Sequence, residues 1–312
     1  MKISVVIPMF NEARHIGRTL ASIRRAADFA RIECELLVVD NGSTDDGPRI
    51  AVAQGARVLD YPGISIGALR NRGVEAATGD GLAFVDADIE VPPDWLTVWR
   101  DIHDRRSADV LALVCDIPAD APWFARVWQY RGNRRARDWL ATSNLCMPRS
   151  WFLRVGGFDE GLRTSEDKDF TLRLHRVGAR LLSLPAPKVI HWGYERSWRE
   201  WLGKEYWRQS GGLKLIQTGG GLRALRFPLL CAGVAASTLV ALALALVCPL
   251  PAALALLPGL LAAFVLVLRQ RASRHPLFMT QLMALHWLRL HVAAAALLSG
   301  FFRRPARRPE RG

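Results

Sequence analysis

The sequence predicts an α/β domain with a mixed, mainly parallel sheet flanked by helices, followed by C-terminal transmembrane helices. Through the first two hundred residues, short apolar runs rich in β-branched residues alternate with helical patterns, which is typical of such a sheet. Residues 227–268 then contain no charged side chain, which indicates membrane helices. Half of the 312 residues are apolar, so the chain can bury a core and disorder is not expected.

Five strands are expected, at Ile3–Pro8, Glu35–Asp40, Arg57–Tyr61, Gly81–Asp86 and Asp109–Cys115. Between the first two strands, Ile16, Leu20 and Ile23 recur at helical spacing, and Asn11 is the expected N-cap of that helix. The strands end in acidic or turn residues. Because ligands of open α/β sheets bind beyond the carboxyl ends of the strands, those ends are the expected site.

Two uncharged segments have the length of membrane helices. Phe227–Val247, as a helix rising about 1.5 Å per residue, extends roughly 31 Å, enough to cross a bilayer core. Cys248-Pro-Leu-Pro251 interrupts the helix, and Ala252–Leu268 is near the lower limit for spanning; a buried soluble hairpin is the alternative. Leu277–Phe302 contains polar residues and precedes a basic tail, so we expect an interfacial amphipathic or hairpin helix, with a third span as the alternative.

The positive charge is concentrated beside these segments. The net charge is +13, yet residues 1–195 hold 26 Lys/Arg against 26 Asp/Glu, whereas residues 196–226 hold 7 against 2 and residues 269–312 hold 9 against 1. This asymmetry indicates Arg-rich segments that stay cytoplasmic beside membrane helices, and it leaves no basic patch for nucleic acid. The expected location is therefore a bacterial-type inner membrane, with residues 1–225 in the cytoplasm and residues 226–312 as the membrane anchor.

The cysteines and the N-terminus agree with that location. Five cysteines are scattered without a Cys-x-x-Cys pair, which fits neither a zinc site nor a disulfide framework and indicates a reducing compartment. No basic, apolar leader precedes the first strand, so nothing is expected to export the N-terminal domain.

An apolar strand, Gly81-Leu-Ala-Phe-Val, leads into Asp86-Ala-Asp88. Two carboxylates beyond a strand end repel each other unless a cation lies with them, and such hard oxygen ligands suit Mg²⁺ or Mn²⁺ bound to a diphosphate. An isolated Asp-x-Asp is more often a solvated turn, so the interpretation depends on the motifs around it.

Further motifs follow in a fixed order along the chain: Val5-Val-Ile-Pro8-Met-Phe-Asn11-Glu12, Leu37-Val-Val-Asp40-Asn-Gly42-Ser43-Thr-Asp45, Arg70-Asn71-Arg-Gly73, Ala77-Thr-Gly79-Asp80, Gly156-Gly-Phe-Asp-Glu160 and Ser165-Glu166-Asp167. Together with the acidic pair they resemble family 2 glycosyltransferases of the GT-A fold, over about residues 2–210. The ordered set is specific although each motif is common alone.

The resemblance implies roles for individual residues. Pro8, Phe10 and Glu12 would shape the nucleoside pocket, Asp40 would contact the base, and Arg70 would bind the donor. Asp86 would face the ribose and the metal, and Asp88 would ligate the metal on the diphosphate. Simple structural roles compete with these: Pro8 can end a strand, Asn11 can cap a helix, and Asp40-Asn-Gly-Ser can form a turn.

The Glu166-Asp167 pair precedes a helical pattern that ends at Gly178, so its carboxylates lie at a helix N-terminus, where the dipole favours their ionised form. By resemblance, Asp167 removes the proton from the acceptor hydroxyl, with Glu166 and Asp169 as other candidates; a capping role is the alternative. His191, in Val189-Ile-His-Trp192, occupies the place of a further metal ligand, although a single histidine is more often structural.

Ser197-Trp-Arg-Glu200 has the pattern of a capping box and opens a helix with aromatic and basic residues interleaved, near 197–215. This helix is suited to the membrane interface and to presenting a lipid-borne acceptor, but it can equally pack on the catalytic domain. Processive relatives carry Gln-x-x-Arg-Trp in such a region, whereas this chain has Glu205-Tyr-Trp-Arg-Gln209. The difference favours the transfer of one sugar.

The resulting hypothesis is an inverting, Mg²⁺- or Mn²⁺-dependent glycosyltransferase with a nucleotide-sugar donor and a membrane lipid or lipid-linked glycan as acceptor. Two other functions compete with it. One is a polyprenyl-phosphate sugar synthase, in which the attacking phosphate is already an anion. The other is an inactive, membrane-anchored glycan-binding scaffold.

Overall fold

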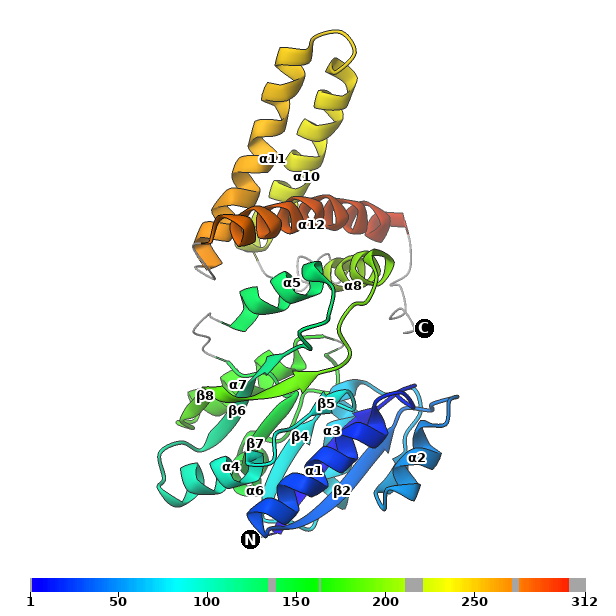
Figure 1. Ribbon diagram of the computed structural model, residues 1–312, viewed down its shortest axis with the longest axis vertical. Helices are drawn as coiled ribbons and strands as arrows, with labels where there is room; N and C mark the ends of the chain where they lie inside the picture. The colour runs from blue at the N-terminus through cyan, green and yellow to red at the C-terminus, as the bar shows by residue number, and fades with distance from the viewer. Residues whose placement is uncertain (1, 134–138, 163, 211–220, 271–274, 303–312) are drawn as a thin grey trace. The chain divides into compact units, whose positions relative to one another are not determined.

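The structure is a computed structural model that describes residues 2–133, 139–162, 164–210, 221–270 and 275–302 (Figure 1). The chain divides into two compact units. The sheet unit comprises Met1–Pro118 and Ala136–Tyr194, and the helical unit comprises Ala119–Arg135 and Glu195–Gly312. The sequence-based division at residues 225 and 226 stays a prediction, because contacts within the chain do not show which segments enter a membrane.

The described part of the sheet unit holds one mixed, mainly parallel sheet in the strand order β3-β2-β1-β4-β7-β6-β8-β5. The strands are β1 (Lys2–Met9), β2 (Glu33–Asp40), β3 (Arg57–Asp60), β4 (Gly81–Val85), β5 (Ile89–Glu90), β6 (Val110–Asp116), β7 (Asn144–Pro148) and β8 (Leu181–His191). Strands β3, β2, β1 and β4 run parallel, and β7 is antiparallel to both β4 and β6. The predicted fold class is confirmed, and all five predicted strands form.

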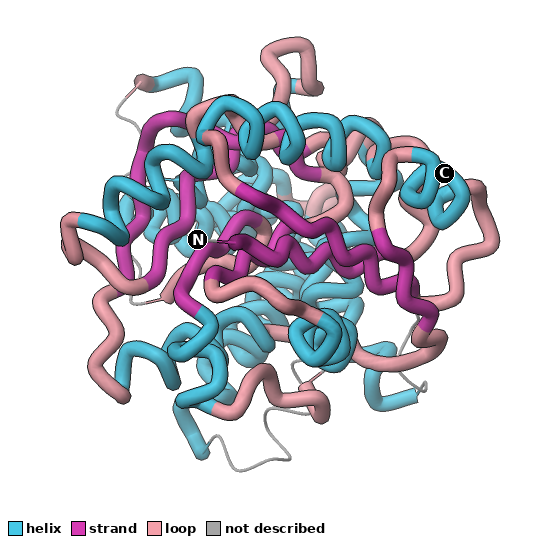
Figure 2. The backbone as a smooth tube through the Cα atoms, turned by 90° about the horizontal axis from the view of Figure 1, so that it is seen from below, coloured by secondary structure: helices cyan, strands magenta, loops and turns pink. Residues whose placement is uncertain are grey.

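Helices cover both faces of this sheet (Figure 2). On one face, α1 (Ile16–Ala30), α2 (Gly47–Ala53) and α4 (Trp95–Asp104) pack on side chains such as Val5 and Ile7 of β1. On the other face, α3 (Ile66–Ala76), α6 (Arg149–Val155) and α7 (Glu166–Arg176) pack on Val6 and its neighbours. Alternate residues of β1 thus face opposite layers, and the near-continuous apolar runs follow from burial on both faces.

Strands β5, β7 and β8 were not predicted. The sequence of β8 contains Pro185 and Pro187, which remove backbone donors and argue against a strand. Its pairing with β6 shifts register between Leu113 and Cys115, where Leu184 and Val189 are the respective partners. Both prolines lie in this irregularity, so the strand continues on either side of them.

The prediction that Asn11 caps the first helix is wrong. Helix α1 begins at Ile16, with His15 at its N-cap and the carbonyl of Glu12 accepting from the backbone N–H groups of His15 and Ile16. Asn11 has φ of 53°, a left-handed conformation that asparagine tolerates, and its Oδ1 accepts from the backbone N–H of Thr44 at 2.8 Å. Its side chain therefore joins two loops instead of capping a helix.

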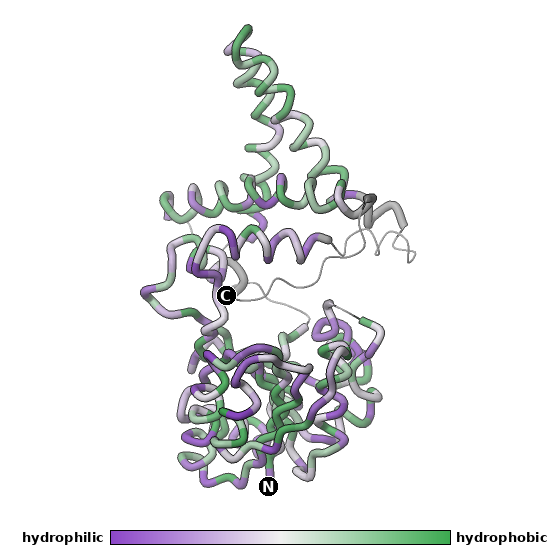
Figure 3. The backbone as a smooth tube through the Cα atoms, turned by 90° about the vertical axis from the view of Figure 1, so that its right-hand side faces the viewer, coloured by the Kyte–Doolittle hydropathy of each residue, from purple (hydrophilic) through white to green (hydrophobic). Residues whose placement is uncertain are grey.

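The helical unit contains α5 (Trp123–Asn133), α8 (Trp198–Ser210), α10 (Gly221–Leu244), α11 (Pro249–Gln270) and α12 (Pro276–Phe302). The capping box at α8 forms: Ser197 Oγ accepts from the N–H of Glu200, and Glu200 accepts from the N–H of Arg196. Helices α10 and α11 pair as a hairpin that is almost entirely hydrophobic (Figure 3). Pro249 and Pro251 lie in the first turn of α11, where a helix tolerates proline.

Among the described residues of this unit, three helices are long and apolar enough to cross a membrane: Arg226–Leu244, Pro249–Gln270 and Pro276–Ser299. The mean hydropathies of 18-residue windows in these helices are 2.1, 2.4 and 1.4, in the same order. The first two correspond to the predicted spans. The third falls on the segment expected to be interfacial, and length and composition alone allow it to span.

Candidate active site

Two loops at the carboxyl edge of the sheet are joined by hydrogen bonds. The backbone N–H of Asn41 donates to the carbonyl of Met9 at 2.8 Å, and Ser43 Oγ accepts from the N–H of Asn11 at 2.8 Å. The carboxylate of Asp40 accepts from the N–H of Ser43 at 2.9 Å and from the Ser43 hydroxyl. Asp40 therefore does form the turn that its sequence context suggested, and the same bonds hold the loops after β1 and β2 together.

The side chains of this loop pair differ in exposure. Pro8 is buried within β1 and Glu12 is buried where α1 approaches, whereas the ring of Phe10 is 46% exposed. An exposed aromatic ring at the end of a central strand is suited to stacking on a planar base. Of the three residues expected at the nucleoside pocket, Phe10 is the one whose side chain is exposed to solvent.

Asp86 and Asp88 follow β4 but have different environments. The side chain of Asp86 is 35% exposed and that of Asp88 is 4% exposed. Asp88 Oδ2 lies 3.3 Å from Nε2 of His191. Strand pairing produces this contact, because Ile89 pairs with His191 and the N–H of Trp192 donates to the carbonyl of Asp88 at 2.8 Å.

Asp88 and His191 are therefore brought together, while Asp86 turns toward another partner. Among the described residues, no group of three or more His, Cys, Asp or Glu side chains is placed to hold a metal ion by itself. Mg²⁺ and Mn²⁺ on a diphosphate need few protein ligands, because phosphate and water oxygens fill most positions. The buried Asp88 carboxylate with the His191 imidazole fits such a cation.

Arg70 of α3 lies between two parts of the site. Its guanidinium is buried, with one nitrogen 3.0 Å from Asp86 Oδ1 and another 2.9 Å from Glu166 Oε1. Burial alone would lower the pKa of Arg70, but the negative charges of Asp86 and Glu166 outweigh it and raise this pKa. The contact to the donor that the resemblance implied for Arg70 stays a prediction, since in this structure two carboxylates engage the guanidinium.

Helix α7 carries Glu166, Asp167 and Asp169 in its first turn, as the sequence predicted. Ser165 precedes them with φ of 66°, an uncommon left-handed conformation for serine. Glu166 is buried against Arg70, and Asp169 pairs with Arg173 at 2.8 Å on the same helix. Asp167 Oδ1 accepts from the N–H of Lys168 at 2.7 Å.

Burial, reinforced by the negative charge of Glu166, raises the pKa of Asp167 to about 6, against a smaller opposing effect of the Lys168 N–H and Arg70. A carboxylate with a pKa near neutrality is a better proton acceptor than an ordinary aspartate. The two neighbouring acids are each engaged by an arginine. The environment of these three carboxylates therefore favours Asp167 as the base.

Four phenylalanines fix α7 against β4. Phe158 stacks on Phe170 with ring centroids 4.1 Å apart, and Phe84 of β4 meets both rings edge to face. Phe152 of α6 completes the group. Because Phe84 directly precedes Val85 and Asp86, this packing places the start of α7 beside the end of β4. Phe158 of the Gly-Gly-Phe motif thus belongs to the aromatic cluster that packs beneath the site.

Trp192 was not identified from the sequence as part of the site. Arg18 of α1 lies 3.8 Å from the centre of its indole ring, and its Nε1 donates to Glu90 Oε2 at 2.8 Å. These contacts fix the orientation of the Trp192 side chain. Its position directly after His191 is the signal that could have indicated it.

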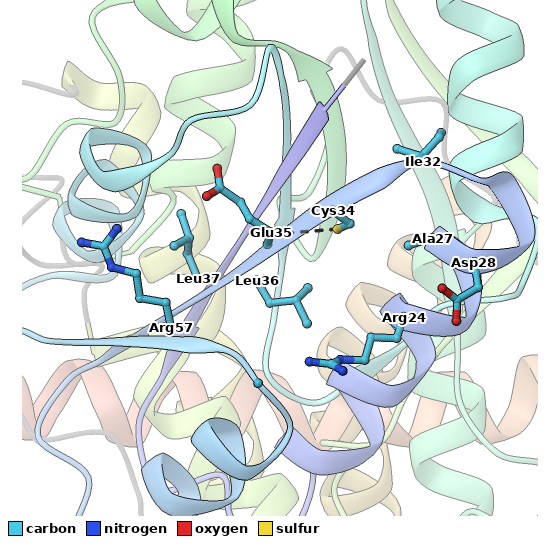
Figure 4. A pocket seen from close by; sticks show the side chains of 10 residues that line it. Arg24, Ala27, Asp28, Ile32, Cys34, Glu35, Leu36, Leu37 and Arg57 are labelled. Atoms are coloured by element: carbon cyan, nitrogen blue, oxygen red, sulfur yellow. Dashed lines mark hydrogen bonds between the residues drawn. The ribbon is translucent and has the colours of Figure 1, made fainter.

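A pocket of 380 Å³ lies at the other end of β2, where the strand begins (Figure 4). Arg24 and Asp28 of α1, Cys34 of β2 and Arg57 of β3 are among its lining residues. Burial raises the pKa of the Cys34 thiol to about 12, so it is not a reactive nucleophile. This pocket holds none of the residues that the sequence indicated for chemistry.

Comparison with known proteins identifies the class to which this fold and site belong. The family described as Glycosyl transferase family 2 matches residues 4–161, about half of the chain, and the related Glycosyl transferase family group 2 matches residues 101–267. The chain belongs to glycosyltransferase family 2. The resemblance inferred from the motifs is thereby confirmed.

One relative and two solved structures illustrate the similarity. The Validoxylamine A glucosyltransferase of Streptomyces hygroscopicus subsp. jinggangensis is 29% identical over 219 residues, which cover 56% of this chain and 52% of the relative. Mannosyltransferase PcManGT from Pyrobaculum calidifontis, solved with GDP-Man and Mn²⁺, matches with a TM-score of 0.60 at 20% identity and covers 95% of this chain and 86% of its own. TarS 1-349 of S. aureus, solved with UDP-GlcNAc, matches with a TM-score of 0.51 at 23% identity over 61% of this chain and 58% of its own.

These comparisons establish the family and the fold, and they do not identify the acceptor. The two structural matches confirm the GT-A fold of the sheet unit. The chain spans about half the length of the curated relatives that it matches.

Proposed function

We propose that this protein is an inverting, metal-dependent glycosyltransferase that moves one sugar from a nucleotide-sugar donor to a membrane-associated acceptor, a lipid or a lipid-linked glycan. The environment of Asp167 carries this proposal. Its carboxyl group has a pKa of about 6, and the adjacent Glu166 is tied through Arg70 to Asp86 at the end of β4. The residue next to the proposed proton acceptor is thus linked by Arg70 to the strand end at which we place the diphosphate.

The donor lies along the carboxyl edge of the sheet in this proposal. Phe10 stacks on the base, Asp40 contacts the base edge, and Pro8 and Glu12 shape the pocket. Asp86 faces the ribose, and Asp88 with His191 holds Mg²⁺ or Mn²⁺ on the diphosphate. When bound, the cation neutralises charge on the leaving nucleoside diphosphate. Relatives of the fold support this arrangement, since PcManGT was solved with GDP-Man and Mn²⁺ and TarS with UDP-GlcNAc.

Asp167 accepts the proton of the acceptor hydroxyl while the hydroxyl oxygen attacks the anomeric carbon of the sugar. The bond between that carbon and the diphosphate oxygen breaks in the same step, and the electron pair leaves with the nucleoside diphosphate. A single displacement of this kind inverts the anomeric centre. Glu166 keeps its carboxylate on Arg70 and so has a positioning role, which leaves Asp167 free to take the proton.

A membrane-associated acceptor is proposed because the same chain carries apolar helices of membrane-spanning length. The excess positive charge lies on both sides of residues 227–268 and not within them, so we propose that the sheet unit and the C-terminal tail lie in the cytoplasm.

The test uses the full-length protein purified in detergent. Nucleotide-sugars are first screened for thermal stabilisation that depends on Mn²⁺, because a ligand that binds the folded state raises its melting temperature. Transfer from the best donor is then compared for the wild type, Asp167→Asn and Asp169→Asn, the last being a matched control on the same helical turn. Asp167→Asn should lower turnover by roughly a hundredfold or more with donor binding intact, and Asp169→Asn should change it little.

Two outcomes would reject parts of the proposal. Near-normal turnover of Asp167→Asn would mean that the acceptor is already ionised, as in a polyprenyl-phosphate sugar synthase. If no nucleotide-sugar binds with or without metal, the protein is an inactive scaffold.

A further inference from the structure

Helix α12 is enclosed from two sides within the helical unit. It packs against α10 and α11 on one side and against α5 and α8 on the other, and it runs crosswise to the α10–α11 hairpin (Figures 1 and 3). In the windows that qualify as candidate spans, 39% of α12 is buried, against 17% and 22% for α10 and α11. Burial between two helical layers therefore accounts for part of the apolar surface of α12 without a membrane crossing.

The polar residues of α12 have partners on α5 and α8. Arg289, near the middle of α12, lies 3.5 Å from Glu205 of α8, whose side chain is 1% exposed. Glu205 also accepts from Nε1 of Trp128 on α5 at 3.2 Å and pairs with Arg208. Ser299, near the end of α12, shares a hydrogen bond with Tyr206 of α8. These contacts tie α12 to α8 from its middle to its end.

Helix α8 cannot follow α12 into hydrocarbon. Five of its 13 residues are charged: Arg199, Glu200, Lys204, Glu205 and Arg208. If α12 crossed the bilayer, Arg289 would lie near the midplane, and α8 would be drawn in beside it with its charges. Glu205, Arg208 and Arg289 pair with one another, but Arg199 and Glu200 of α8 are exposed. Exposed charges are tolerated only where they reach the aqueous interface, which places α8 at the membrane surface.

Exposed apolar side chains are found on the hairpin and on α5 and α8. The hairpin exposes Leu239, Leu242, Leu246 and Leu250, which are between 66% and 96% exposed, as expected of a segment surrounded by acyl chains. Trp123 of α5 and Trp198 of α8 are also exposed and contact each other edge to face. Tryptophans and basic residues near an apolar segment are typical of the headgroup region.

We propose that α12 does not cross the membrane but lies in its cytoplasmic surface, between the lipid-embedded hairpin and the helices α5 and α8. The occupant of the surface formed by α5, α8, α12 and the hairpin is thus the bilayer itself. This inference rests on the proposed membrane attachment and is independent of the proposed chemistry.

The first experiment fuses a reporter after Gly312 of the full chain. Alkaline phosphatase, which is active only when exported, should be inactive there, and a fluorescent protein that matures in the cytoplasm should fluoresce. An active phosphatase would mean that α12 spans the membrane and would overturn the proposal.

The second experiment measures depth. In the full chain, with its five cysteines replaced, single cysteines at Leu277, Ala284 and Leu298 carry an environment-sensitive fluorophore, and the protein is reconstituted with lipids that bear a nitroxide in the headgroup or deep in the acyl chain. All three positions should be quenched more by the headgroup nitroxide. Stronger quenching of Ala284 by the acyl-chain nitroxide would show a spanning helix, and no quenching by either lipid would show that α12 is not at the membrane; both outcomes overturn the proposal. Transfer activity in the same samples separates this result from the fate of the proposed reaction.

Discussion

Replacing Asp167 by asparagine should stabilise the protein at neutral pH while it disables the proposed reaction. The carboxyl group is half-buried and lies beside the negative charge of Glu166, which is why its pKa is raised from 3.8 to about 6. An acid with a raised pKa in the folded state binds its proton more tightly when folded than when unfolded. Its effect is therefore to make stability fall as pH rises from about 4 to about 6.

The size of this effect follows from the two pKa values. The difference between 3.8 and about 6 corresponds to about 3 kcal/mol of lost stability at pH 7 as an upper limit, and to about half of that at pH 5. Asparagine has no charge to bury, and its Oδ1 can still accept from the N–H of Lys168. For a domain of this size, a gain of about 2–3 kcal/mol raises the melting temperature by roughly 4–10 °C.

The assay is thermal unfolding of the full-length protein in detergent between pH 4 and pH 8, without donor or metal. The stabilisation by Asp167→Asn should be greatest at pH 7 and above, and should fade toward pH 4. Asp169→Asn is the control, because Asp169 is partly exposed and paired with Arg173, so its loss should cost less than about 1 kcal/mol. If Asp167→Asn melts at or below the wild-type temperature at every pH, the carboxylate is not held in an unfavourable environment and the argument for its role as a base fails.

Four further results are expected. Wild-type turnover should fall about tenfold per pH unit below pH 6, because the base must be ionised, and a flat profile down to pH 5 would contradict this. Asp88→Ala should lose Mn²⁺-dependent donor binding in calorimetric titration, since it removes the buried carboxylate beside His191, and unchanged affinity and metal dependence would reject the assignment. Arg70→Met should cost about 3–5 kcal/mol in denaturant unfolding because it strands Glu166 and Asp86, whereas Arg72→Met at a more exposed pair should cost less than about 1 kcal/mol; equal costs would count against the bridging role. Gly73→Ala should cost about 1–3 kcal/mol by the same measurement, because its methyl group would lie 2.3 Å from Val6 Cγ1 between α3 and the sheet, and a neutral effect would show that α3 can move away.

Some of the site followed from the sequence because its residues border regular elements. Asp40 ends β2, Asp86 directly follows β4, and Glu166 and Asp167 open a helix, so periodicity alone places them at element ends. The uncharged residues 227–268 likewise predict a hairpin of two membrane helices, because their composition alone indicates it.

Other features depended on partners that are distant in the chain. The pairing of Arg70 with Asp86 and Glu166 was not predicted, because it depends on the packing of α3 and α7 on the same face of the sheet, which brings Arg70 to a residue 96 positions away in the chain. The contact of His191 with Asp88 arises from the pairing of β5 with β8. Strand β8 was not predicted because its sequence contains two prolines.

The sequence by itself determined which residues lie at strand ends, which segments are apolar and where the charge accumulates, because these properties belong to single elements and their burial. The tertiary structure alone decided which ends face one another. It decided that Arg70 joins two carboxylates, that α7 is seated on β4 by four phenylalanines, and that the apolar α12 is covered by neighbouring helices on two sides. The physical reason is that hydrophobic burial is nondirectional and specifies only that a face is covered, whereas the choice of the covering partner depends on strand order, register and packing shape across the whole unit.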